Sequence, residues 1–318
     1  MKHIKGNPAI NKFISTFALL FALIGIILIL SIANGNFMTP KNIANILTQI
    51  SINGYLTIGA MCVMLTGGID LSSGSILALS GVVTASMVQT SSKNPSIALG
   101  IVLAFAVGIG FGLLNGLLVS RAKIVPFIAT LATMSIVRGT AYIYANGRPI
   151  TGLMQDYLNI GNGKIGLISY PVIVLLVALI LAYFFLYRTK TGRYIYAVGG
   201  NEYAAMVSGV KVKNTKMLAY TISGAMAALT AIILTSRVTS GLPQAGQGYE
   251  MDAIAACAIG GVSLSGGRGR LLSVVIGIVL LGVINNGMDM LNVSSYYQSI
   301  LKGMIILLAV GLDVKKKD

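Results

Sequence analysis

Long apolar runs separated by short polar stretches recur along the whole chain. Such runs predict α-helices that cross a bilayer, because a helix needs about 20 apolar residues to span the hydrocarbon core. The pattern is typical of an all-α polytopic membrane protein with about ten transmembrane segments. The predicted segments are residues 13–33, 43–66, 75–90, 97–120, 125–145, 170–187, 217–238, 251–261, 271–290 and 296–312.

Two of these segments need a separate interpretation. Residues 251–261 are too few to cross a bilayer and are flanked by glycines. We predict a half-span or broken helix there, which is tolerated only where it is buried in protein or lines a cavity. Residues 13–33 form too long an apolar run for a cleaved signal peptide, and no A-x-A site follows them. We interpret them as the first span.

The basic residues fall between the apolar runs and set the orientation. With the N-terminus inside, sixteen of the 23 basic side chains lie on the cytoplasmic side and four lie outside. Cytoplasmic loops carry such an excess of Lys and Arg. We therefore predict that both termini are cytoplasmic. Residues 1–318 are expected to form a single transmembrane domain, with a cytoplasmic loop at 188–216.

The composition narrows the class of protein. The chain is 55% hydrophobic and 10% charged, whereas a soluble domain is about 25% charged. The net charge of +15 follows the loops, so we expect contact with the lipid bilayer and none with nucleic acid. Cys62 and Cys257 lie inside apolar runs, and His3 is the one histidine. No metal site and no catalytic residues are expected.

The loop at 188–216 contains a pattern for a short helix over Glu202–Val207. Asn201 is a good N-cap, Glu202 suits the positive end of the helix dipole, and Gly199-Gly200 predicts a flexible turn before it. Small side chains would let another protein approach closely, although a helix resting on lipid headgroups is the alternative. The candidate docking residues are Gly200, Asn201, Glu202, Ala204, Ala205, Ser208 and Gly209.

A weak internal repeat joins the two halves of the chain. Residues 67–75 read GGIDLSSGS and residues 260–269 read GGVSLSGGRG, and each follows an apolar segment that carries a cysteine. Corresponding glycine-interrupted segments point to a transport pathway at the interface of two repeats. Two similar glycine-rich turns that arose by chance are the alternative.

Five segments in order carry the motifs of a known family. They are TGGIDLSSGS (66–75), PFIATLATMSIVRGTAYIYANGRPI (126–150), TGRYIYAVGGNEYAAMVSGVKV (191–212), GYEMDAIAACAIGGVSLSGGRGR (248–270) and NNGMDMLNVSSYYQ (285–298). These segments resemble the permease subunits of bacterial ATP-binding cassette (ABC) importers for monosaccharides. The SSYYQ run and the LAVGLDVKKK end are most similar to the ribose type, while permeases for xylose, galactose and autoinducer-2 share most of the motifs.

The resemblance implies an inner-membrane transport subunit, not an enzyme, that works by alternating access. It implies a cytoplasmic ABC ATPase that uses ATP and Mg²⁺, an extracytoplasmic sugar-binding protein and a second copy of this chain. No cofactor is expected on the chain itself. Consistently, GGRGRLL at 266–272 lacks the Lys-Ser/Thr pair of a Walker A motif.

A sugar path needs neutral donors and acceptors, and we expect no ion pairs along it. Intramembrane polar residues often mark such paths, though many only join helices. Asp70, Glu250 and Asp252 lie at segment ends, where helix capping is expected, and Arg138 has no identifiable partner. An ion-coupled secondary transporter, which usually has mid-membrane carboxylates, is the less favoured alternative. The tentative pathway residues are Asn53, Thr57, Asn115, Asn285 and Asn286.

Overall fold

The protein is a bundle of helices in which every predicted apolar segment coincides with a helix. The computed structural model describes residues 8–315, with side chains described for 19–304, 307 and 311; Lys2, Lys5, Lys316 and Lys317 lie outside this range. The helices that match the predicted segments are α1 (Pro8–Ala33), α2 (Pro40–Leu65), α3 (Ser73–Val88), α4 (Ile97–Ser120), α5 (Pro126–Tyr144), α7 (Tyr170–Arg188), α10 (Val212–Arg237), α11 (Tyr249–Ile259), α12 (Leu271–Met290) and α13 (Ser295–Lys315).

Short elements join these helices at the two ends of the bundle. The helix α6 (Gln155–Asn162) leads into an antiparallel hairpin, in which Lys164 pairs with Ser169. Between α7 and α10 come two further short helices. The connecting elements are β1 (Lys164–Ile165), β2 (Ile168–Ser169), α8 (Lys190–Gly200) and α9 (Glu202–Val207).

Five helices in the described part of the chain are long and apolar enough to cross a membrane, namely α2, α4, α7, α10 and α12. The predicted short segment is the 11-residue helix α11. A multi-pass helical membrane protein is therefore confirmed, while the count of ten spans stays a prediction.

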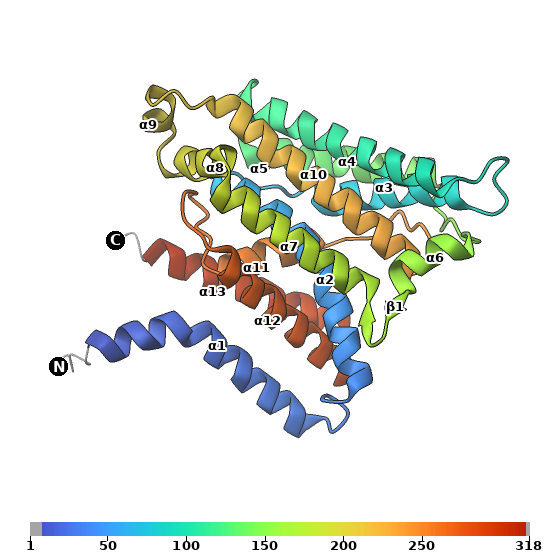
Figure 1. The fold of residues 1–318 in the computed structure, drawn as a ribbon, viewed down its shortest axis with the longest axis horizontal. Helices are drawn as coiled ribbons and strands as arrows, with labels where there is room; N and C mark the ends of the chain where they lie inside the picture. Colours follow the sequence, from blue (N-terminus) through green and yellow to red (C-terminus); the bar gives the residue numbers. More distant parts are fainter. Residues whose placement is uncertain (1–7, 316–318) are drawn as a thin grey trace.

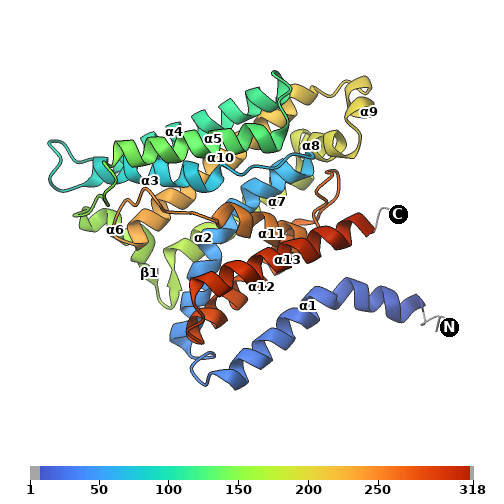
Figure 2. The ribbon, with the colours of Figure 1, turned by 180° about the vertical axis from the view of Figure 1, so that it is seen from behind.

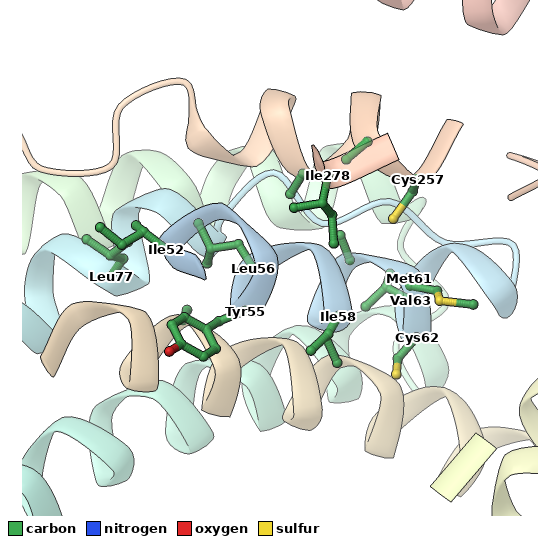
Figure 3. Close-up of a cluster of buried hydrophobic side chains, with 14 of the residues drawn as sticks. Ile52, Tyr55, Leu56, Ile58, Met61, Cys62, Val63, Leu77, Cys257 and Ile278 are labelled. Carbon is green, nitrogen blue, oxygen red and sulfur yellow. The ribbon is translucent and has the colours of Figure 1, made fainter. Parts of the chain in front are cut away.

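Helix α2 forms the centre of the bundle, and most of its residues are buried. Figure 3 shows its side chains Ile52 and Leu56 close to Leu77 of α3 and Ile278 of α12, all within one apolar core. The polar side chains of α2 are satisfied locally: Ser51 Oγ donates to the Thr48 carbonyl at 2.7 Å. Local bonds of this kind let hydroxyl groups lie inside an apolar helix.

Glycines let α4 and α10 approach closely. Gly108, Gly112 and Gly116 repeat every four residues on α4, are all buried and face α10. A Cβ atom at Gly112 would lie 2.6 Å from the carbonyl oxygen of Tyr220 on α10. In a membrane, where the hydrophobic effect drives helices together only weakly, small residues of this kind give the close packing that holds a pair together.

The two ends of the bundle carry different elements. One end carries both chain termini, α8 and α9, and the other carries α6 and the β-hairpin (Figures 1 and 2). We call these the α9 end and the hairpin end. The start of α1 and the end of α13 thus lie at the α9 end, while the orientation of the bundle in the membrane stays a prediction.

The structure bears on two glycine-rich segments singled out from the sequence. Gly199 and Gly200 form the last turn of α8, so the predicted flexible turn is wrong. The segments 67–75 and 260–269 lie against each other at the α9 end, where a Cβ at Gly67 would lie 3.2 Å from the Ser265 carbonyl oxygen, while their origin as an internal repeat stays a prediction. The helices that precede them differ in length, since α2 has 26 residues and α11 has 11.

Candidate functional site

A polar cavity of about 620 Å³ opens in the half of the bundle nearer the hairpin end. It is enclosed by the first half of α2, the last turns of α10 and α12 and the first turns of α11 and α13. Amide side chains dominate its polar lining, and each amide can both donate and accept hydrogen bonds. These amides are Asn45, Gln49, Asn53, Asn285, Asn286 and Gln298.

Three of the predicted pathway residues line this cavity: Asn53, Asn285 and Asn286. Asn286 also exchanges two hydrogen bonds with Asn42, at 2.9 and 3.0 Å, and so holds α12 against α2. Asn285 is different, because its Oδ1 atom has no hydrogen-bond partner. An unpaired buried acceptor is costly, which makes Asn285 the amide best placed to gain a partner on ligand binding.

The other two predicted pathway residues lie away from the cavity lining. Thr57 is fully buried and donates to the backbone carbonyl of Asn53 at 2.7 Å. Asn115 Nδ2 donates to Ser72 Oγ at 2.7 Å. Ser72 and Ser223 in turn donate to the buried Asp70 carboxylate, at 2.6 and 2.7 Å. The Thr57 bond therefore lies within α2, whereas Asn115 ties α4 to the turn before α3. Asp70 accepts from the Ser72 amide in that turn, but no side chain caps the first turn of α3, so Asp70 does not take the predicted capping role.

The cavity also contains charged groups, which contradicts the expectation of a path without ion pairs. Lys302 Nζ on α13 donates to Asp252 Oδ2 on α11 at 2.8 Å, and Arg237 and Asp289 stand in the same wall. A buried carboxylate is tolerated when a counter-charge and hydrogen bonds compensate its desolvation. The partners are 50 residues apart in the chain, so no local pattern marks the pair.

A pattern in the sequence of α2 could have identified some of the cavity residues that the sequence-based prediction missed. Asn45, Gln49 and Asn53 recur every four residues on α2, and side chains at this spacing lie on one face of a helix. A polar stripe on an otherwise apolar helix faces protein or water in preference to lipid. The cavity residues on α10, α11 and α13 show no comparable stripe.

At the α9 end, the short helix forms as predicted. The Ala204 amide donates to the Asn201 side-chain oxygen at 2.9 Å, and α9 covers Glu202–Val207. Glu202 forms a 2.6 Å salt bridge with Lys216 at the start of α10. Ser208 ends the helix, and Gly209 follows with φ +84°, a backbone conformation that favours glycine.

The exposed surface of α9 differs from the one the sequence indicated. Ala205 is buried against Val198 and Val212, so it holds the helix in place and is not available to a partner. Ala204 is exposed, as expected for a docking residue. The large exposed side chains are those of Tyr203, Met206 and Val207, which the sequence interpretation missed. We call Tyr203, Met206 and Val207 the α9 surface.

Three glycine-containing segments meet at the last turn of α8. Gly199 of α8 lies against the Leu65 carbonyl at the end of α2, and the Gly267 amide donates to that carbonyl at 2.9 Å. A Cβ at Gly266 would lie 2.7 Å from the Gly67 nitrogen, closer than real contacts allow. We call these five residues the glycine junction; it joins α8 to the end of α2 and to the loop before α12.

Two tyrosine hydroxyls reinforce this junction. Tyr196 on α8 donates to the Gly269 carbonyl at 3.1 Å, and Tyr187 at the end of α7 accepts from the Leu271 amide at 2.9 Å. Burial, together with the neighbouring Tyr187, raises the pKa of Tyr196, so its hydroxyl stays protonated and available as a donor. The element that carries α9 is thus bonded to the start of α12, whose far end lines the cavity.

Arg138 on α5 has its hydrogen-bond partners in a loop, and the Glu250 carboxylate lies close enough to interact with its charge. Its Nη1 atom donates to the carbonyls of Pro243 and Ala245, at 2.8 and 2.7 Å. These bonds hold the glycine- and proline-rich segment that leads into α11, the half-length helix that carries Asp252.

Replacing Arg138 by methionine is expected to lower the stability of the protein by at least about 2 kcal/mol, since each hydrogen bond from a charged group contributes about 1.5–3 kcal/mol. Thermal unfolding in detergent, followed by circular dichroism, measures the change. Arg148→Met is the matched control, because Arg148 is exposed in the loop after α5. Equal unfolding temperatures for the two variants would contradict the role of Arg138.

The chain is a multi-pass membrane protein with a polar cavity between its helices and an exposed short helix at one end. This arrangement is typical of the membrane subunit of a transporter. The chain matches the family model described as "Branched-chain amino acid transport system / permease component" over residues 42–310. The chain belongs to this permease family.

Individual relatives agree with this membership over nearly the full length. The ribose import permease protein RbsC of Bacillus subtilis is 47% identical over 92% of this chain and 90% of its own. RbsC of Haemophilus influenzae is 42% identical over 98% and 97%. The D-allose transport system permease protein AlsC of Escherichia coli is 39% identical over 87% and 84%. No solved structure was found to match the chain.

Proposed function

We propose that this chain is the permease subunit of an ABC importer that carries ribose, or a closely related monosaccharide, across the inner membrane into the cytoplasm. The amide-lined cavity is the observation that carries the proposal. Its volume of about 620 Å³ falls within the range of about 300–1,000 Å³ typical of ligand sites. Amides suit a ligand that carries many hydroxyls and no charge. The near-full-length ribose permease relatives support the choice of sugar.

The charged pair in the cavity fits this function as well. A carboxylate such as Asp252 accepts hydrogen bonds from hydroxyl groups, and Lys302 donates them. Their mutual pairing keeps both charges compensated while the cavity is empty. A proton- or sodium-driven transporter would also place a carboxylate here, but membership of an ABC permease family favours ATP as the energy source.

The proposal includes partners on both sides of the membrane. A cytoplasmic ABC ATPase, which binds the ATP and Mg²⁺, docks on the α9 surface. A sugar-binding protein delivers its cargo at the hairpin end, the end nearer the cavity, and a second copy of the chain completes a homodimer. We place both termini in the cytoplasm, with about ten membrane segments. The shared position of the termini and α9 at one end supports this orientation (Figure 1).

The glycine junction provides the coupling route in this scheme. ATP binding moves the ATPases, and α9 and α8 move with them. Because Gly199 and Gly267 both contact the end of α2, this motion reaches α2 and, through Tyr187, α12. Both helices line the cavity, so the motion can change which side of the membrane the cavity faces.

Replacing Asn285 by leucine is expected to lower the rate of sugar uptake about tenfold at low substrate concentration. The reason is that the cavity loses an unpaired acceptor, which is equivalent to about 1–3 kcal/mol. Initial rates of radiolabelled ribose uptake in whole cells measure the effect. Asn94→Leu, in an exposed loop between α3 and α4, is the control. Normal uptake by the Asn285→Leu variant would show that the transported sugar does not pass through this cavity.

The substrate is tested by deleting the gene and measuring uptake of ribose, xylose, galactose and autoinducer-2. We expect loss of ribose uptake alone, restored by the intact gene. Loss of another of these substrates would keep the mechanism and change the sugar. Unchanged uptake of all four would overturn the proposed substrate class.

A further inference from the structure

A second hollow, of about 370 Å³, lies between the end of α7 and the start of α12. It is at the α9 end of the bundle, away from the amide-lined cavity (Figure 1). The residues around it are Tyr183, Tyr187, Arg188, Arg270 and Leu272. No role in the transport path described above accounts for this combination of two arginines and two tyrosines.

Both arginines are exposed and available to an anionic ligand. Among the side chains that the structure describes, the salt bridges join Lys216 to Glu202 and Lys302 to Asp252, so neither Arg188 nor Arg270 is paired with a carboxylate. The planar guanidinium group binds phosphate through two parallel hydrogen bonds. Two such groups around one hollow therefore define a site for a phosphate.

The position of the hollow identifies the source of that phosphate. Helices α7 and α12 are both long and apolar enough to cross the membrane, and the arginines lie where these helices end. Leu272, which lines the hollow, is exposed by 72%, and Ile180, about two turns before Arg188 on α7, is exposed by 68%. These apolar side chains face the acyl chains. The rings of Tyr183 and Tyr187 lie 5.0 Å apart, and tyrosines are enriched at the membrane–water boundary.

We propose that this hollow binds the phosphate headgroup of an anionic phospholipid in the leaflet that faces α8 and α9. This proposal requires only that the protein spans the membrane, and it holds whichever side of the membrane α8 and α9 face. The bound lipid touches the contact between α7 and α12, because Tyr187 both lines the hollow and accepts a hydrogen bond from the Leu271 amide. The lipid is therefore placed to strengthen the contact between α7 and α12.

The test uses the full chain in nanodiscs of phosphatidylcholine, titrated with phosphatidylglycerol and followed by native mass spectrometry. The double variant Arg188→Gln/Arg270→Gln is expected to bind phosphatidylglycerol at least about tenfold more weakly, because it loses the paired hydrogen bonds from two guanidinium groups to the phosphate. The control Arg121→Gln/Arg268→Gln removes the same charge from exposed positions at the same end, and it is expected to bind within about twofold of the natural protein.

Three results would overturn the proposal. Equal weakening in both double variants would show general attraction to surface charge. Displacement of the lipid by millimolar inorganic phosphate would show a site for free phosphate. Unchanged binding in the Arg188→Gln/Arg270→Gln variant would exclude the hollow. If that variant does not insert into the membrane, Arg270→Lys provides a second test, because it keeps the charge but removes the planar guanidinium group. Arg270→Lys is expected to weaken lipid binding more than Arg268→Lys does.

Discussion

Replacing Gly199 by alanine is expected to lower sugar uptake severely, although the variant protein still reaches the membrane. The added Cβ would overlap the Leu65 carbonyl and lie 2.5 Å from the Gly267 nitrogen, and both of these are backbone atoms. Overpacking of this kind typically costs about 1–3 kcal/mol and shifts the backbone. The junction would open, so that motion of α8 would no longer reach α2. We expect uptake to fall at least tenfold.

The control for Gly199→Ala is the same substitution at a glycine that has free space around it. Gly110 lies in the membrane helix α4 and has no atoms within 4 Å of its added Cβ, so Gly110→Ala controls for the substitution itself. Tyr196→Phe removes the hydrogen bond to Gly269 without adding bulk and is expected to lower uptake by a smaller factor. ATPase activity of the assembled transporter separates the causes, because an uncoupled complex hydrolyses ATP without transport. Normal uptake by Gly199→Ala would show that the junction does not transmit motion.

Replacing Met206 by aspartate is expected to prevent the ATPase from assembling with the permease. The side chain of Met206 is 55% exposed and lies with those of Tyr203 and Val207 on the α9 surface. A charge introduced at the centre of an apolar contact typically weakens an interface by about 2 kcal/mol or more. Co-purification of the two proteins should fall about thirtyfold or more, and uptake should be lost with it.

The matched control is Leu167→Asp, at the tip of the β-hairpin, which is 85% exposed at the opposite end. It introduces the same charge on an exposed apolar position and should leave ATPase co-purification unchanged. The comparison with Ala205 is also informative, because a bulky residue there would disturb the contact with Val198 and Val212. Full assembly of the ATPase with the Met206→Asp variant would show that the ATPase docks somewhere other than the α9 surface.

Local patterns predicted the helices well. The boundaries of α4 and the six residues of α9 agree with the sequence-based ranges. These features depend on apolar length and on a cap three residues away, as in the bond from the Ala204 amide to Asn201. The short helix α11 was also predictable, because its length falls below that of a span.

The features that the sequence did not predict depend on residues far apart in the chain. The Asp252–Lys302 pair joins α11 to α13, and the glycine junction brings residues 65–67, 199 and 266–267 together. The burial of Ala205 likewise follows from contacts with α8 and α10. Among the five candidate pathway residues, only the relative rotation of the packed helices decides that Asn285 lines the cavity and Asn115 does not. Spacing within one helix cannot determine these contacts.

Reconstitution tests the proposed function most directly. The purified chain, its ATPase and the sugar-binding protein are combined in proteoliposomes, with ATP enclosed and labelled ribose outside. The mechanism predicts that ribose accumulates against its gradient, and that omitting the ATP, the ATPase or this chain stops it. The Gly199→Ala protein should hydrolyse ATP in the same vesicles without accumulating ribose. Accumulation driven by a proton or sodium gradient in the absence of ATP would contradict the account.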